Sequence, residues 1–416
     1  MTRRRLFEPF AGWLIKHDWT SRVIAGAYDS KSPEQRRRIV AENPHSYLGV
    51  TRSREDLEHG DAATDEDLLQ RGADTLTSIL KAEAFEPTGR PTMYAYRLTA
   101  DEHTQIGVVG AMDVGGYSDG RILTHENVRP TRAKLLGDHL HWVGATSSPV
   151  SLTYRADPVI QGTLHDATVA TKPDIDHVVE GVRHQVWALE SDAATRIADQ
   201  LAEAVIYVTD GHHRSAAALA GAAKKPEAEQ FQRTLAVLFP DDALQVEPFH
   251  RRCVDAHGRT PDEIIAAFAE VAEVEEVDSI EGAVPHTRGH VGVYIRGRWW
   301  RLTLAPVDRP GALAHLDVER VRRDLITSVL GIDELAPNSG IDYVPSPAGL
   351  DEVVRRCDID GNVGLFLYPT SVSEIMAVAD AHELMPPKSS YVAPKPRSGL
   401  FLRILGSGAT AHLDPS

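Results

Sequence analysis

The chain has 416 residues, of which 42% are hydrophobic and 25% charged; this is ordinary for a globular protein and long enough for two or three packed units. Its formal net charge of −16 opposes binding along nucleic-acid phosphates, so we expect no nucleic-acid partner. Two cysteines are too few for a disulfide framework or a cysteine-rich zinc site, and they suit a reducing cytoplasm. No run reaches the roughly eighteen apolar residues of a membrane helix, so we expect a cytoplasmic protein that makes no membrane contact.

The first part of the chain, residues 1–147, combines helices with strands. Apolar residues recur at near-helical spacing over 55–86, which predicts a helix. Two strand-like stretches within 92–114 are separated by a polar turn. After a glycine-containing loop, Pro130 begins a predicted helix that runs through Trp142. We treat this part as an N-terminal α+β region.

The middle part, residues 148–285, alternates strands with helices. Strands are predicted over 148–155, 178–190, 204–210 and 233–240, and helices over 191–204, with Ser191 as N-cap, and 213–223. Such alternation favours a layer of sheet and helices that contains some parallel strand pairs. The predicted fold class is therefore mixed α/β.

The last part, residues 286–416, begins with a clear hairpin over 290–304. A helix (316–330), a strand (363–369) and a second helix (372–384) are predicted to follow. The chain then becomes basic, rich in proline and nonhelical, with Lys388 and Lys395 between prolines that fix an extended backbone. Four apolar residues follow as anchors: Leu400, Phe401, Leu402 and Ile404. The segment is thus either a lid that brings both lysines to phosphate or a strap that only covers the core.

One motif carries most of the chemical information, the sequence AVIYVTDGHHRSAAALAGAA. A buried strand ends at Asp210, Gly211 permits a tight turn, and a small-residue helix begins near Arg214 or Ser215. Backbone amides and the helix dipole make such a turn an anion site, and a guanidinium can donate paired hydrogen bonds to phosphate. The residues predicted to bind the cofactor are Gly211, His212, His213, Arg214 and Ser215, with Lys388 and Lys395. The alternative is an ordinary Asp-Gly turn before a surface helix.

Other nucleotide and hydrolase signatures are missing from the sequence. It contains no P-loop, no GxGxxG after a strand, no protein-kinase signature set and no GxSxG elbow. The two adjacent histidines would point apart on a regular element, which disfavours a metal site there. Any nucleotide chemistry must therefore use a different scaffold.

Three positions are candidates for catalysis and one for metal binding. Glu126, preceded by His125, follows a glycine-containing loop and is a candidate acid/base pair; the alternative is a solvated pair ahead of the Pro130 helix. Asp210, at the strand end, is the third catalytic candidate. Asp29 is a candidate Mg²⁺ ligand, because hard cations prefer carboxylates.

Five short patches resemble the family called domain of unknown function 1015, in the family's order. They are AGAYDS (25–30), with Ala where the family has two prolines, ENPHSYLGV (42–50), GRILTHENV (120–128), IYVTDGHHRSAAAL and MPPKSSYVAPKPRSGL (385–400). That family looks like a branch of the ParB/sulfiredoxin-like superfamily, which contains free-serine kinases. The resemblance implies a ParB/sulfiredoxin-like nucleotide-binding core with additional α/β elements, in which residues 211–214 hold nucleotide phosphates.

The resemblance also implies a reaction. We expect a kinase that uses ATP or ADP with Mg²⁺ to phosphorylate the hydroxyl of a small metabolite, such as a free amino acid like serine. In the free-serine kinases an acidic residue activates the substrate hydroxyl, and the motif does not fix which residue would do so here. The alternatives are a ParB-like switch that binds or hydrolyses nucleotide, and a hydrolase or isomerase of a phosphorylated substrate. The oligomeric state stays open, with a homo-oligomer among the outcomes.

Overall fold

The structure, a computed structural model, describes residues 4–26, 28, 31–51, 53–57, 62–334, 336 and 339–413. The chain forms two compact units, each discontinuous in sequence. Unit 1 contains residues 1–124, 128–244 and 394–416, and unit 2 contains residues 125–127 and 245–393. The three regions expected from the sequence are consecutive and divide the chain differently. The mixed α/β fold class is confirmed.

Unit 1 is built on a nine-stranded sheet. Its central path runs in the order β6 (Ile122–Leu123), β11 (Ile206–Asp210), β8 (Val150–Tyr154), β12 (Arg233–Pro240), β5 (His103–Asp113), β4 (Tyr94–Ala100), β10 (Val182–Ala188) and β9 (Ile175–Val179), and β1 (Phe7–Glu8) also pairs with β5. The expected parallel pairing is present between β11 and β6 and between β12 and β8. The remaining pairs are antiparallel.

Each face of this sheet is covered by apolar packing. On one face, α5 (Pro158–Ala170) and α6 (Ser191–Gln200) share a buried core with alternate residues of the central strands, such as Val108 and Leu238. The opposite residues of the same strands, such as Val109 and Phe239, pack in a second core. That core includes α3 (Asp65–Lys81) and the small sheet β3 (Phe85–Pro87), β2 (Trp13–Ile15), β21 (Phe401–Ile404) and β7 (Ala145–Thr146).

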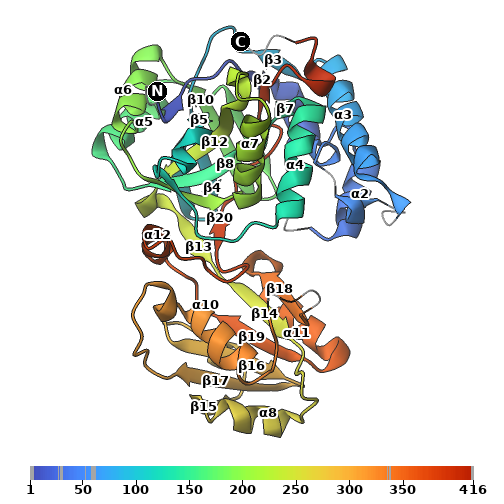
Figure 1. The fold of residues 1–416 in the computed structure, drawn as a ribbon, viewed down its shortest axis with the longest axis vertical. Helices are drawn as coiled ribbons and strands as arrows, with labels where there is room; N and C mark the ends of the chain where they lie inside the picture. Colours follow the sequence, from blue (N-terminus) through green and yellow to red (C-terminus); the bar gives the residue numbers. More distant parts are fainter. Residues whose placement is uncertain are drawn as a thin grey trace. The chain divides into compact units, whose positions relative to one another are not determined.

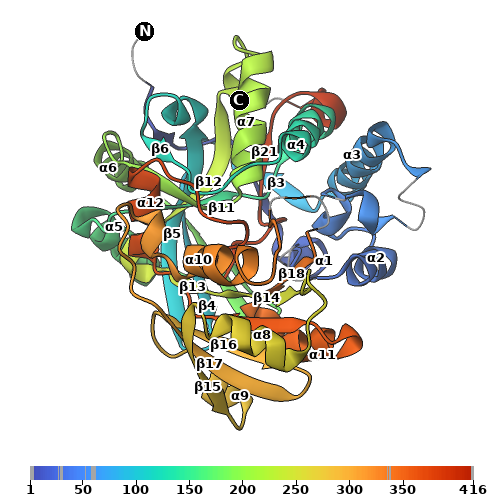
Figure 2. The ribbon, with the colours of Figure 1, turned by 60° about the horizontal axis from the view of Figure 1, so that its bottom comes forward.

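Two further helices of unit 1, α4 (Pro130–Val143) and α7 (His212–Lys224), lie side by side (Figure 1), and Figure 2 shows the same pair from a second direction. They approach closely because small residues meet: a Cβ on Gly137 of α4 would stand 3.8 Å from the Cβ of Ala220 in α7. Helix α7 also contacts β8 and β12. Short helices α1 (Thr20–Val23) and α2 (Pro33–Glu42) complete the N-terminal part.

Three local expectations for unit 1 need correction. The helix expected over 55–86 begins at Asp65, because Thr64 caps it there by accepting a bond from the amide of Asp67. Helix α5 was absent from the expected elements, although Asp157 caps it and Pro158 occupies its first turn. The N-cap of α6 is Glu190, so that Ser191 is already helical.

Unit 2 contains an antiparallel sheet of six strands and a short two-stranded one. The larger sheet has the order β15 (Ala272–Val277), β17 (Arg298–Leu304), β16 (His290–Ile295), β19 (Val363–Leu367), β14 (Phe249–Cys253) and β18 (Ile341–Pro345), and the smaller pairs β13 (Gln245–Glu247) with β20 (Tyr391–Ala393). The predicted hairpin is confirmed as β16–β17. The helices of unit 2 are α8 (Pro261–Phe268), α9 (Ile280–Ala283), α10 (Asp317–Arg320), α11 (Leu350–Asp360) and α12 (Val372–Asp380). Helix α10 continues as a π-helical stretch over Val321–Thr327.

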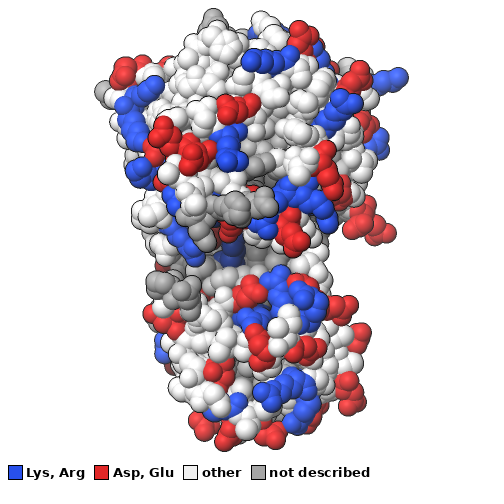
Figure 3. Space-filling model, turned by 90° about the vertical axis from the view of Figure 1, so that its right-hand side faces the viewer, with Lys and Arg blue, Asp and Glu red and all other residues white. Residues whose placement is uncertain are grey.

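The charged residues on the surface are mixed in sign, as the sequence composition predicts. Figure 3 shows Lys and Arg interspersed with Asp and Glu over the face drawn, without a continuous basic track. Among the described residues, no helix is long and apolar enough to span a membrane. Cys253 and Cys357 are buried free thiols, and burial raises the pKa of both.

Candidate functional site

The connection between β11 and α7 is a strand–turn–helix unit built around one glycine. Gly211 has φ +97°, a left-handed conformation that glycine adopts without strain. A Cβ at this position would also come within 3.0 Å of the Arg214 guanidinium, which folds back beneath it. The pairing of β11 with β8 shifts register between Val208 and Asp210, a bulge of the kind that re-aims side chains beside active sites. The predicted turn is therefore present, and the helix begins at His212.

Asp210 stands at the centre of an ionic network at this turn. One of its carboxylate oxygens, Oδ2, accepts from Nη2 of Arg214 at 2.5 Å, and the other, Oδ1, lies 2.5 Å from Nζ of Lys395. Arg214 also donates from Nη1 to the carbonyl of Pro149 at 2.5 Å. Two cations, a guanidinium and an ammonium, thus converge on one carboxylate at the turn.

The start of α7 adds to this positive character. Gly211 has no side chain that could cap the helix, and its carbonyl accepts the first helical bond, from the Ser215 amide at 2.9 Å. The amides of the first turn have no acceptor within the helix, and the helix dipole concentrates partial positive charge at the same end. The cations and the helix start together form an environment suited to an anion.

The histidines and serine of the motif differ in their surroundings. His212 and Ser215 are buried, 4% and 2% exposed. Nε2 of His213 accepts a hydrogen bond from the amide of Arg129 at 3.2 Å, which joins the starts of α7 and α4. A ring nitrogen that accepts a hydrogen bond is not protonated, so Nε2 of His213 acts here as an acceptor.

The C-terminal segment that carries Lys395 is fixed in unit 1 by long-range contacts. The Pro394 carbonyl accepts from Nε2 of Gln105 at 3.0 Å, and the Gly399 amide donates to Oγ of Ser147 at 2.7 Å. The four expected anchors are all buried, at 0–2% exposure: Leu400, Phe401, Leu402 and Ile404. The segment is therefore anchored at its far end, and it holds Lys395 at the turn.

The other candidate residues belong to unit 2 or fall among residues that the structure does not describe. His125 and Glu126 belong to unit 2, where the His125 carbonyl accepts from the Met385 amide at 2.7 Å and Glu126 pairs with Met385. Lys388 is also in unit 2, with φ +55° and its ammonium 5.4 Å from the centre of the Phe249 ring. Asp29 lies outside the described residues. Within the part of the chain that the structure describes, no group of three or more His, Cys, Asp or Glu could hold a metal ion.

With this geometry established, the family can be assigned. The sequence model of the family described as "Protein of unknown function (DUF1015)" matches residues 7–319. The chain belongs to this family. The match includes the turn at 210–215 but ends before the C-terminal segment that carries Lys395. No curated protein matches the chain.

Several solved structures show a distant likeness. Free serine kinase in complex with AMP is 14% identical and covers 74% of this chain and 95% of its own, with a TM-score of 0.36. C-terminally truncated SbnI from Staphylococcus aureus is 9% identical, with coverages of 70% and 85% and a TM-score of 0.36. A conserved hypothetical protein from Pyrococcus furiosus is 14% identical, with coverages of 72% and 96% and a TM-score of 0.33. Likenesses at these values carry no argument about activity.

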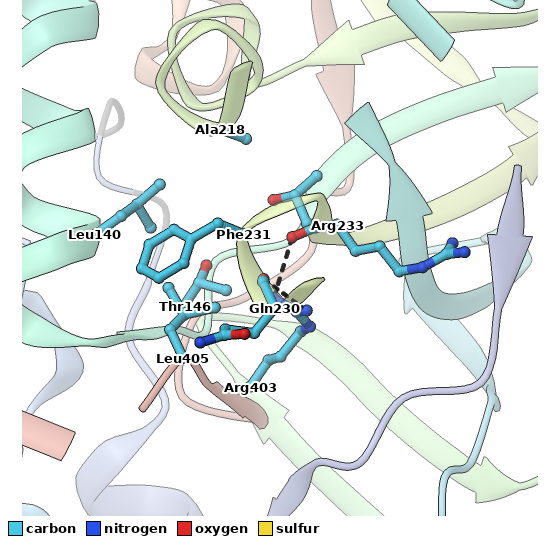
Figure 4. A pocket seen from close by; sticks show the side chains of 9 residues that line it. Leu140, Thr146, Ala218, Gln230, Phe231, Arg233, Arg403 and Leu405 are labelled. Carbon is cyan, nitrogen blue, oxygen red and sulfur yellow. Dashed lines mark hydrogen bonds between the residues drawn. The ribbon is translucent and has the colours of Figure 1, made fainter. Parts of the chain in front are cut away.

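Two hollows of unit 1 do not include the turn. One, shown in Figure 4, has a volume of about 10 Å³, room for about one water molecule, and is lined by Phe231, Arg403 and Leu405 among others. A larger surface hollow, about 390 Å³, is lined by residues of α3 and α4, such as Asp74 and Trp142, with Gly408 and Ala409. None of the predicted phosphate-binding residues lines either hollow.

Sequence reasoning found the turn and Lys395 but missed the neighbours that complete them. The Pro149 carbonyl, which holds Arg214, gives no sequence signal, because any residue supplies a carbonyl. Arg397, which follows Lys395 by two residues, was also passed over, and the structure shows it buried and paired with Glu180.

Proposed function

We propose that the chain binds the phosphates of ATP or ADP at the β11–Gly211–α7 turn and transfers a phosphoryl group to the hydroxyl of a small metabolite. A free amino acid such as serine is the first acceptor to test. The observation that carries the proposal is the convergence of Arg214 and Lys395 on Asp210 at the start of α7. The resemblance of the DGHHR core to phosphate-holding turns supports the same assignment.

Phosphoryl transfer asks mainly for positioning and charge neutralisation. In this proposal, Arg214 donates paired hydrogen bonds to phosphate oxygens, and Lys395 supplies a point charge. Asp210 accepts from both cations and so keeps them in place, which gives it a positioning role in preference to a catalytic one. Mg²⁺ would accompany the nucleotide, held mainly by its phosphates with one or two carboxylates, and would neutralise phosphate charge.

The transfer itself exchanges one bond for another. The acceptor oxygen bonds to the terminal phosphorus while the bond from that phosphorus to the bridging oxygen of the nucleotide breaks, and the acceptor proton passes to a carboxylate. Glu126 is proposed for this proton, with His125 beside it. Glu126→Gln is then expected to lower turnover about 10²–10⁴-fold while nucleotide affinity is retained. Unchanged turnover would remove Glu126 from the reaction.

The test of the proposal has two parts. The first incubates the protein with ATP or ADP and a panel of hydroxylated metabolites and detects products by phosphorus NMR. The second measures nucleotide affinity by isothermal titration for wild type, Arg214→Ala and Arg196→Ala, the last being an exposed arginine on α6. Arg214→Ala is expected to lose about 1–3 kcal/mol, the range for hydrogen bonds to charged groups, and the control none. Nucleotide binding without a phosphorylated product would assign a switch, and wild-type affinity in Arg214→Ala would refute the phosphate site.

A further inference from the structure

A cluster of polar side chains lies buried on one face of the large sheet of unit 1. His184 of β10 pairs with Leu98 of β4, and Leu98 pairs with Gln105 of β5. Directly paired residues project to the same face, and so does Tyr96, two residues from Leu98. His184, Gln105 and Tyr96 are each 0% exposed. Three polar groups therefore share a surface that is otherwise apolar core.

Hydrogen bonds link the members of this cluster. Oη of Tyr96 accepts from the Arg397 amide at 3.4 Å and lies 2.7 Å from Nδ1 of His184. The tautomer in which the Tyr96 hydroxyl donates to Nδ1 carries the His184 proton on Nε2, and this is the tautomer that the inference uses. Burial, with Arg397 and His177 as nearby cations or potential cations, lowers the pKa of His184 to about 3, so the ring is neutral.

Arg397, in the C-terminal segment, brings a guanidinium to the same cluster. Its exposure is 6%, and its Nη2 lies 3.4 Å from Oε2 of Glu180. Nε and Nη1 have no hydrogen-bond partner among the described residues, nor do Nε2 of His184 and Oε1 of Gln105. Leaving a buried donor of a charged group without an acceptor is costly, and native proteins generally avoid it. Two unsatisfied donors on one buried guanidinium indicate that an acceptor with several lone pairs belongs there.

The charges indicate a monoanion. Glu180 also pairs with Lys31, so two cations face one carboxylate and leave one positive charge in excess. A guanidinium presents its donors in a planar fork that matches a carboxylate in shape. We propose that Arg397, with the Nε2 hydrogen of His184, binds the carboxylate of the acceptor molecule. This inference rests on the proposed function and specifies its substrate class as small hydroxy acids, amino acids included.

The C-terminal segment connects this cluster with the turn at 210–215. Lys395 contacts Asp210 of the turn, and Arg397 follows it by two residues in a stretch that Pro394 and Pro396 stiffen. Two residues of extended chain separate their Cα atoms by about 6.6 Å. The two side chains have different partners, Asp210 at the end of β11 and Glu180 between β9 and β10, and we assign the acceptor's carboxylate to the second of these places.

The experiment compares acids with their amides. L-serine, D-glycerate and L-lactate are titrated into the full chain with and without ATP, each beside the amide that lacks the carboxylate charge. At least one acid is expected to bind tenfold or more tightly than its amide in wild type. Arg397→Met is expected to abolish that preference, Arg397→Lys to restore it in part, and ATP affinity to stay unchanged in both variants.

The matched control is Arg183→Met. Arg183 precedes His184 on β10, so its side chain projects to the opposite face, where it pairs with Asp176 and is 54% exposed. It is expected to keep the wild-type preference. Equal binding of acids and amides, no binding of any acid at millimolar concentration, or retention of the preference in Arg397→Met would each overturn the inference. Displacement of the bound acids by inorganic phosphate alone would also overturn it. Absence of ATP binding in the wild type, by contrast, would refute the proposed function. The titrations of acids and amides without ATP would then still decide whether Arg397 binds a carboxylate.

Discussion

Arg397 and Arg403 lie six residues apart on the same segment of unit 1, and both are buried, yet their surroundings differ. Arg403, on β21, donates from Nη1 to the Arg233 carbonyl at 3.1 Å and from Nη2 to the Gln230 carbonyl at 2.8 Å (Figure 4). The side chain of Arg397 has one ion pair at 3.4 Å and two nitrogens without a partner among the described residues. Burial alone therefore does not separate a structural arginine from a binding one, whereas the set of partners does.

The largest expected effect is the loss of stability when Arg403, the structural arginine, is replaced. Arg403→Met leaves two buried carbonyls without their donors, and each such loss costs about 1–3 kcal/mol. We expect the free energy of unfolding, measured with urea, to fall by about 3 kcal/mol. Binding of ATP per folded molecule should stay as in wild type. Unchanged stability would show that Arg403 is replaceable and would remove the contrast with Arg397.

The pH dependence of stability tests the state of His184, in the cluster beside Arg397. The folded pKa of His184, about 3, is below its unfolded value of about 6.5, so the unfolded chain binds the extra proton first as pH falls. Stability is therefore full above about pH 6.5 and is lost between there and pH 3, by up to about 1.4 kcal/mol per pH unit. In His184→Gln this contribution disappears. Urea unfolding at pH 7 and pH 5 should show a smaller acid loss in the variant, by about 2 kcal/mol, and equal losses would contradict the neutral ring.

The two arginines also show what sequence can and cannot supply. The strand–turn–helix geometry at 210–215 was predictable because its parts are consecutive: a buried strand ending at Asp210, a glycine, and a helix start. Strands and the 290–304 hairpin were predictable from local alternation. The cluster of Tyr96, His184 and Arg397 was not, because strand order and the return of the C-terminal segment bring it together. Nothing local distinguishes Arg397 from Arg403.

The position of Glu126 illustrates the same limit. Its neighbours in sequence suggested a loop before the Pro130 helix, and the helix is present as α4. Residues 125–127 nevertheless group with unit 2, through pairing with Met385, some 260 residues later. Such a pairing depends on long-range packing, and no spacing pattern within the segment predicts it.

A moderate effect is expected at Lys395, which lies on the same segment as both arginines. Lys395→Met keeps most of the apolar stem and removes the charge beside Asp210. We expect ATP affinity to fall about tenfold, which corresponds to about 1.5 kcal/mol, the lower end for a hydrogen bond to a charged group, and the salt dependence of binding to flatten. The melting temperature should change little. A lower melting temperature with intact affinity would instead make the segment a strap, and Lys388→Met measured in parallel decides whether the second lysine contributes.

The smallest expected effect is the stability of Arg397→Met, and it is the sharpest test of the comparison. The wild-type side chain holds a buried charge whose Nε and Nη1 have no partner, so removing it relieves a desolvation cost. It also removes the pairing with Glu180, but that carboxylate is 37% exposed and retains Lys31. The two terms oppose each other, and replacement of a poorly satisfied buried ion by an apolar side chain is often neutral or stabilising. We therefore expect the free energy of unfolding to change by less than about 1 kcal/mol, against about 3 kcal/mol for Arg403→Met. Urea denaturation of both variants under one set of conditions gives the answer. If Arg397→Met is as destabilising as Arg403→Met, Arg397 is a structural residue; if it is neutral, the unsatisfied guanidinium is retained for a purpose other than stability.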